Sequence, residues 1–278
     1  MMSLFNQTAL ECSKLITERY STSFTLGIKT LDKKFHLPIY AIYGFVRYAD
    51  EIVDTFHDHD KKRLLDRFRA DTYLAIEEGI CLNPVLHSFQ MVVREYGIER
   101  ELIDAFLRSM EMDLYRHDYD AAGYSDYIYG SAEVVGLMCL RVFCEGNGEE
   151  YDRLREPARK LGSAFQKVNF LRDIKSDYQE RGRTYFPGVD FTDFSRDAKQ
   201  LIEDDIQRDF DEAYQGILAL PRGARMGVHL AYTYYLKLFC KIKGVPASRI
   251  QQERIRVPDP QKLALLAKTM VQYRLNLL

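Results

Sequence analysis

The sequence predicts an all-α protein. Apolar residues recur every three or four positions over long stretches, which is the spacing of one face of an α-helix. No stretch shows the apolar and polar alternation of a half-buried strand. The 278 residues include only eight prolines and 16 glycines, so there is little of the turn punctuation that sheets and hairpins need.

The expected helices follow one another with short polar turns between them. The first ends in the turn Tyr20–Phe24, and a strong one follows Pro38, where apolar residues from Ile42 to Phe56 share one buried face. Asn83 is expected to cap a further helix that Pro84 opens. The predicted ranges are 5–20, 38–56, 61–79, 84–96, 99–117, 124–145, 151–181, 195–219, 222–242 and 260–275.

Composition and organisation limit the class of protein. No linker or fixed-period repeat interrupts the helices, so residues 1–278 are expected to form a single domain. The net charge of −2 gives no reason to expect nucleic acid as a partner. Five scattered cysteines without a CxxC pair argue against a disulfide framework or a zinc site. Without a signal-peptide pattern or a long apolar run, we expect a cytoplasmic protein, at most peripheral to a membrane.

The stretch 165–187 carries a polar stripe on an otherwise apolar helix. Its members, spaced three, four and four residues apart, are Gln166, Asn169, Asp173 and Asp177. A helix that is apolar nearly all round is usually buried, so the stripe is expected to line a cavity, where two aspartates need a cation. The alternative is an exposed helix whose stripe meets water, and Lys167 and Lys175 favour it.

A second acidic stripe lies on the helix predicted at 38–56. Its members are Tyr43, Arg47, Asp50 and Asp54. Each stripe thus places two carboxylates one turn apart beside an arginine, Arg47 or Arg172. Mg²⁺ is usually held by one or two carboxylates together with substrate phosphates, and arginines bind phosphate oxygens by charge-assisted hydrogen bonds. The two stripes therefore predict a site for Mg²⁺ and a diphosphate. The later acidic run Glu203–Asp205 lacks such partners and is expected to be a solvated face.

Four segments in order along the chain resemble the squalene/phytoene synthase family. They are Tyr20–Phe24, AIYGFVRYADEIVD at 41–54, YIYGSAEVVGLMCLRVF at 127–143, and QKVNFLRDIKSD at 166–177 with GRTYFP at 182–187. The resemblance implies a single-domain helical bundle of the isoprenoid-synthase type with a central cavity. It also implies two aspartate-rich motifs on facing helices, and joining of two prenyl diphosphates head to head.

Site residues follow from the resemblance by position. It implies that Mg²⁺, or Mn²⁺ in its place, is bound by Asp50, Asp54, Asn169, Asp173 and Asp177. The residues implied to touch the diphosphate or the first prenyl carbons are Tyr20, Ser21, Thr22, Ser23, Tyr43, Arg47, Gln166 and Arg172, with Arg183 and Tyr185 in a following flap. Tyr234 is expected to reach the site from a late helix and to act in catalysis with the four aspartates. Where many relatives read Val-Ala-Gly, this chain has Ser131-Ala132-Glu133.

The expected reaction joins two geranylgeranyl diphosphates to phytoene through a cyclopropyl diphosphate, at the entry to carotenoid biosynthesis. No NADPH is expected to be needed. Leu26 and Ile28 are expected to line the tunnel that sets chain length. The alternatives are a squalene or dehydrosqualene synthase that uses farnesyl diphosphate, and a non-catalytic family member that acts as an assembly factor. Partners are expected to be the prenyl diphosphate and peripherally a membrane.

Overall fold

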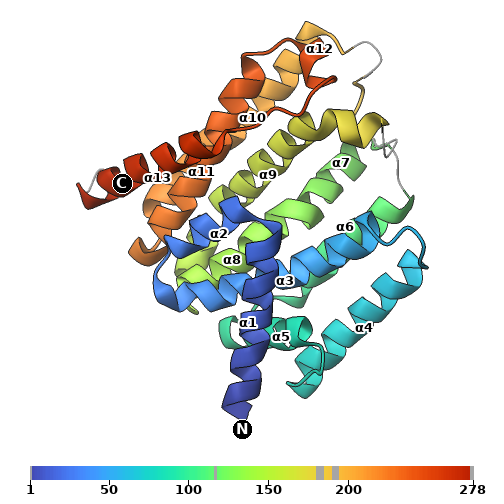
Figure 1. Cartoon of the computed structure of the whole chain (residues 1–278), viewed down its shortest axis with the longest axis vertical. Coiled ribbons are helices and arrows are strands. Elements are labelled where there is room, and N and C mark those ends of the chain that lie inside the picture. Colours follow the sequence, from blue (N-terminus) through green and yellow to red (C-terminus); the bar gives the residue numbers. More distant parts are fainter. Residues whose placement is uncertain (1, 116–117, 180–184, 190–193, 276–278) are drawn as a thin grey trace.

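The computed structural model describes residues 2–115, 118–179, 185–189 and 194–275, apart from the side chains of residues 176–179, 259, 263 and 274. These parts form a bundle of helices without a β-strand, in which α9, α10 and α11 lie side by side (Figure 1). The elements are α1 (Met2–Tyr20), α2 (Thr22–Lys29), α3 (Lys33–Asp54), α4 (Lys61–Glu78), α5 (Pro84–Tyr96), α6 (Arg100–Tyr115), α7 (Ala121–Ile128), η1 (Tyr129–Glu133), α8 (Val134–Cys144), α9 (Gly148–Gln179), α10 (Arg196–Ala219), α11 (Arg222–Lys243), α12 (Ala247–Ile250) and α13 (Asp259–Arg274). The all-α prediction is confirmed.

Local signals place most helix ends as predicted. The Asn83 side chain accepts hydrogen bonds from the backbone of Val85 and Leu86 at the start of α5. Gly97 ends the same helix with a positive φ of 65°, which a glycine adopts without steric cost. Two predictions were wrong. The polar turn after Tyr20 continues into α2, capped by Ser21, and α3 begins at Lys33 and contains Pro38 in its second turn.

The helix predicted at 124–145 is interrupted by a π-helical turn. η1 separates α7 from α8, and π-helical turns within helices are frequent at functional sites. Gly130 in this turn lies against α6, where an added Cβ would come within 2.5 Å of the Ala105 carbonyl oxygen. The missing side chain of Gly130 therefore lets η1 and α6 approach closely at this turn.

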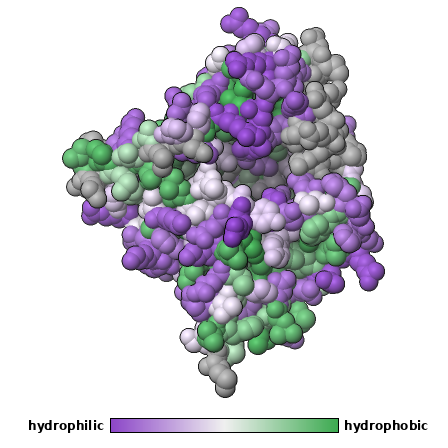
Figure 2. All heavy atoms as spheres, in the orientation of Figure 1, coloured by the Kyte–Doolittle hydropathy of each residue, from purple (hydrophilic) through white to green (hydrophobic). Residues whose placement is uncertain are grey.

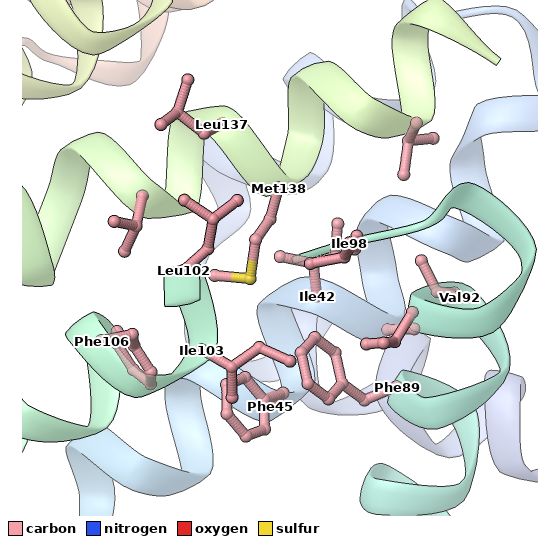
Figure 3. Packing of buried hydrophobic residues seen from close by; sticks show 14 of the residues in the cluster. Ile42, Phe45, Phe89, Val92, Ile98, Leu102, Ile103, Phe106, Leu137 and Met138 are labelled. Carbon is pink, nitrogen blue, oxygen red and sulfur yellow. The ribbon is translucent and has the colours of Figure 1, made fainter. Parts of the chain in front are cut away.

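The core consists of two apolar clusters. In the first, Phe45 of α3 stacks on Phe89 of α5 with ring centroids 3.9 Å apart, and Ile103 of α6 and Met138 of α8 complete the contact (Figure 3). The second cluster joins α9, α10 and α11 around Phe210 and Phe239, whose ring centroids are 5.6 Å apart. Both clusters contribute to the walls of the cavity described below.

Buried charges join α9 to α10. The Lys167 ammonium, on a residue only 8% exposed, donates to Asp205 at 2.5 Å and to Asp209 at 2.7 Å. Glu203, 4% exposed, is bound by Lys199. The prediction of a solvated face at Glu203–Asp205 was therefore wrong for Glu203, because Lys199 provides the partner that a buried carboxylate needs. Lys167 likewise does not indicate an exposed α9.

Within the part of the chain that the structure describes, one helical stretch, Ala121–Cys144, is long and apolar enough to cross a membrane by length and composition. In this structure 56% of its most apolar window is buried inside the protein, among the helices of the bundle.

Candidate active site

An apolar cavity of about 290 Å³ lies between the two core clusters. Its walls include Phe24, Ile28, Leu31, Val46, Phe143 and Phe165. Polar side chains on its wall come from Ser23, Ser131 and Gln166. Of the two residues expected to line a tunnel, Ile28 does so, whereas Leu26 is not among the lining residues.

Glycines let helix backbones form parts of this wall. An added Cβ at Gly162 of α9 would lie 2.8 Å from the carbonyl oxygen of Ala132 in η1. At Gly227 of α11 it would lie 2.9 Å from the carbonyl oxygen of Gly27 in α2. Real Cβ atoms do not approach this closely, so any larger residue at these two positions would push the helices apart.

On α3 the predicted stripe is organised around Arg47. Its guanidinium donates to Asp50 at 2.5 Å and also binds Glu51, and it lies 4.4 Å from the centre of the Tyr20 ring. The Nε atom of Arg47 is buried without a hydrogen-bond partner. The acidic neighbours raise the pKa of Arg47, although burial acts against this shift most strongly. Arg47 is therefore always positively charged, and its Nε–H group makes no hydrogen bond within the protein. Asp54 lies one turn beyond Asp50 and is half-buried.

The first turn of α2 packs beside the stripe of α3 and contributes to the cavity wall. Ser21 accepts from the backbone of Phe24 at 3.2 Å, and Ser23 lines the cavity, whereas Thr22 is exposed. The Phe24 ring stacks on Tyr43 of α3 with centroids 4.9 Å apart. Burial raises the pKa of Tyr43, so its hydroxyl stays protonated near neutral pH.

On α9 the described stripe residues also lie together. Gln166 donates to the Ser131 hydroxyl of η1 at 3.3 Å, and the Asn169 side-chain oxygen is buried without a hydrogen-bond partner. Arg172 donates to both oxygens of Asp173, at 3.0 and 2.5 Å. Its pKa is raised by Asp173 against the opposing effect of burial, which is the largest.

The sequence did not indicate Arg254, which the structure adds to this group. Its Nε atom lies 2.8 Å from Asp173, so two arginines share one carboxylate. Arg254 lies in the irregular segment between α12 and α13, where no helical spacing relates it to either stripe. A basic residue in a segment without periodicity offered no signal.

Tyr235 of α11 links the two stripes and was also missed. Its electrostatic neighbours are Tyr43 of α3 and Asn169, Arg172 and Asp173 of α9. Burial raises the pKa of Tyr235. The predicted residue Tyr234 lies beside it with ring centroids 5.5 Å apart, and turns toward Lys262 of α13, 5.8 Å from the centre of its ring.

Residues 17–261 match the family described as Squalene/phytoene synthase. The chain belongs to this family. It is 30% identical to a 15-cis-phytoene synthase of Synechocystis over 94% of this chain and 84% of that protein. It is 25% identical to a 4,4'-diapophytoene synthase of Staphylococcus haemolyticus over 75% of this chain and 70% of that one.

Solved structures show the same fold. The chain superposes on a crystal structure of a dehydrosqualene synthase in complex with ligand with a TM-score of 0.82 and 21% identity, over 97% of this chain and 98% of the other. As a squalene/phytoene synthase family member, the protein is a prenyltransferase, and the family reaction is head-to-head condensation of prenyl diphosphates.

The family residue that departs from the usual pattern, Glu133, has a partner. Arg159 of α9 donates to it at 2.7 Å, and burial, which Arg159 opposes, raises the pKa of this carboxyl. Arg159 lies seven residues, nearly two full turns, before Gln166, so it is on the same face of α9 as the stripe, and the pair ties η1 to α9 about 10 Å along the helix from Gln166.

The described oxygen donors fit Mg²⁺ in type. Carboxylates and an amide oxygen are the ligands that this ion prefers, and the orphaned buried oxygen of Asn169 is an acceptor that a cation would satisfy. Among the described residues no group of three or more His, Cys, Asp or Glu is close enough to hold a metal by itself. The Asp177 side chain lies outside the described residues, as does Arg183.

Tyr185, the other predicted flap residue, is buried in an aromatic cluster. Its ring stacks on Phe170 with centroids 4.0 Å apart, and Tyr127 lies 5.3 Å away. Phe170 follows Asn169 directly on α9, so Tyr185 packs beside the polar stripe rather than on it.

The geometry predicts different effects for two neighbouring tyrosines. Tyr235→Phe removes a hydroxyl that lies beside Asn169 and Arg172, and we expect turnover to fall about tenfold, the size of effect that one polar interaction gives. Tyr234→Phe is the matched control and is expected to lower turnover less. Steady-state rates of the two variants decide between them, and a larger loss in Tyr234→Phe would contradict the assignment to Tyr235.

Proposed function

We propose that this protein joins two geranylgeranyl diphosphates head to head to form phytoene. One feature carries the proposal, namely an arginine-rich polar group next to an apolar cavity. Named relatives support the choice of product, since they include phytoene synthases of Synechocystis and, at 27% identity, of Cereibacter sphaeroides.

Arginines would bind the diphosphate. Arg47 lies on the stripe of α3, Arg172 on the stripe of α9 and Arg254 in the segment after α12, and guanidinium groups bind phosphate oxygens in bidentate fashion. In the structure each of them is paired with an aspartate, so binding would exchange carboxylate partners for phosphate oxygens.

We propose Mg²⁺ as the cofactor, held by Asp50, Asp54, Asn169, Asp173 and Asp177 together with the diphosphate. The bound ions would stabilise the negative charge on the leaving diphosphate. No reductant enters the proposed reaction.

The cavity would protect the allylic cation. Its apolar wall excludes water, and the faces of aromatic rings such as Phe24 and Phe165 attract positive charge. Burial raises the pKa of Tyr43 and Tyr235, so both hydroxyls remain protonated and act as hydrogen-bond donors rather than bases. The departing diphosphate is then the better acceptor for the final proton.

The test is incubation of the purified protein with Mg²⁺ and either the C15 or the C20 diphosphate, with and without NADPH, with products read by mass. A C40 hydrocarbon from the C20 substrate without NADPH is expected. A C30 product from the C15 substrate alone would instead indicate squalene or dehydrosqualene synthesis. Absence of product from both substrates would favour an assembly factor.

The preference for substrate length is expected to depend on one residue of the cavity wall. Ile28 is 2% exposed and lines the cavity, so Ile28→Phe is expected to reduce turnover of the C20 substrate more than that of the C15 substrate. A single methylene changes such discrimination by about 10-fold or more, and phenylalanine adds more volume than that. Leu26→Phe is the matched control, because Leu26 does not line the cavity. Unchanged C20 turnover in Ile28→Phe would contradict the role of this wall.

A further inference from the structure

The last described helix, α13, has apolar residues on two opposite faces. One face packs on α11, where Thr269 is fully buried and the Tyr273 hydroxyl donates to the Arg222 carbonyl at 3.1 Å. The opposite face is exposed and consists of residues three, four and four positions apart, namely Ala264, Ala267, Val271 and Leu275. We call these four residues the outer face of α13.

A helix that is apolar all round is normally buried. Val271 of the outer face nevertheless keeps 55% of its surface exposed, and Leu275 keeps 64%. Met270 beside them is also exposed. This end of α13 projects from the body of the bundle, and apolar atoms are visible at that tip of the molecular surface (Figures 1 and 2).

The charge around this face has one sign. After Asp259, at the start of α13, the sequence to Leu278 contains no aspartate or glutamate and three basic residues, Lys262, Lys268 and Arg274. Lys262 lies on the side of α11, over the Tyr234 ring, whereas Lys268 borders the outer face. Lys268 is exposed and lies three residues before Val271 on the same helix. An apolar face that is bordered by a lysine and by no acidic residue of its own helix matches an anionic bilayer, because the lipid acyl chains bury apolar groups and the headgroups attract lysine and arginine.

A second group of exposed apolar residues on the surface has acidic residues, rather than basic ones, near it in the sequence. Leu74, Ile80 and Leu82, at the end of α4 and after it, are 51%, 42% and 90% exposed. Asp71, Glu77 and Glu78 lie in the same stretch of sequence, so an anionic surface would repel this group. Apolar exposure alone therefore does not distinguish the two groups, but charge does.

We propose that the outer face of α13 binds the surface of an anionic lipid bilayer. α11, on which α13 packs, lines the cavity through Gly227 and Val228, so the bilayer would lie one helix layer from the cavity wall. The role of this membrane contact in the reaction rests on the proposed function, because a hydrocarbon product must be transferred from the cavity into a lipid phase. The binding itself does not depend on which prenyl diphosphate is used.

The test is sedimentation of the full-length protein with vesicles of phosphatidylcholine alone or mixed with phosphatidylglycerol. Binding to the mixed vesicles is expected, weakened by added salt. The double variant Val271→Glu with Leu275→Glu is expected to bind these vesicles at least about tenfold more weakly, because two buried apolar side chains are lost and two negative charges are added. Lys268→Gln alone is expected to weaken binding about fivefold.

The matched control is Leu74→Glu with Leu82→Glu, which changes equally exposed leucines on the other group and should bind like the unchanged protein. Activity of all variants in detergent micelles should be retained, which separates loss of docking from loss of folding. No vesicle binding by the unchanged protein, or equal binding by the α13 double variant, would overturn the proposal. A dimer in solution that the same double variant disrupts, without vesicle binding, would assign the outer face to a second copy of the chain. Failure to form a C40 product would refute the proposed substrate and leave the vesicle result unaffected.

Discussion

Asp173→Asn is expected to reduce turnover by at least about a hundredfold, the cost of removing one group that stabilises charge in an enclosed active site. Asp173 lies where the side chains of Arg172 and Arg254 meet, and asparagine keeps its shape but not its charge. A neutral amide lacks the negative charge with which a carboxylate holds Mg²⁺, and it leaves two guanidinium groups without their shared carboxylate.

The fold should survive this change, since the Asp173 side chain is partly exposed and belongs to neither apolar cluster. Helical circular dichroism and the melting temperature should therefore remain close to those of the unchanged protein. Asp204→Asn, an exposed carboxylate of α10, is the control and should keep full activity. Near-normal turnover in Asp173→Asn would exclude the assignment of this aspartate to the metal and diphosphate site.

Asp209→Leu is expected to lower the free energy of unfolding by about 3 kcal/mol or more. Asp209 is 3% exposed and accepts from Ser163 at 2.7 Å and from Lys167 at 2.7 Å. Its removal leaves the buried Lys167 ammonium with the more exposed Asp205 as its remaining partner. A buried charge that loses a partner costs more than the pair contributed.

Urea denaturation of three variants tests this account. Asp209→Leu should unfold at a lower urea concentration, and the double variant Lys167→Met with Asp209→Leu should recover part of the loss, because it also removes the buried ammonium that has lost one of its two partners. Asp204→Leu on the exposed face of α10 should change stability by no more than about 0.5 kcal/mol. If the double variant were less stable than Asp209→Leu, the buried charge would not be the cause.

Much of the fold was predictable because helices of this length show a clear three-to-four-residue spacing of apolar residues. The predicted ranges for α4, α5, α10 and α11 agree with the structure to within one residue at each end. The interruption at η1 was not predictable, since a π-helical turn changes the local rise and phase but not the composition. α2 was missed because eight residues are too few to display a period.

The site was predictable where its residues share one helix. The spacing of Arg47 and Asp50 on α3, and of Asn169 and Asp173 on α9, places them on common stripes, as the structure has them. Arg254 and Tyr235 reach the site through tertiary contacts that no spacing encodes. Whether position 234 or 235 points inward depends on the rotation of α11, and adjacent positions differ by about 100° around a helix.

At Gly162 and Gly227 two helix backbones cross at contact distance, and these glycine crossings limit how mutation could change the length of the product. Where a wall is built from main chain held at contact distance, its width cannot adapt by a change of rotamer, and widening would require whole helices to separate. Adaptation to longer or shorter prenyl chains should then proceed through the side chains that close the hollow, such as Ile28 and Leu31, while the crossings stay as they are. A library that varies those side chains should yield active catalysts of altered length preference far more often than one that varies the two glycines.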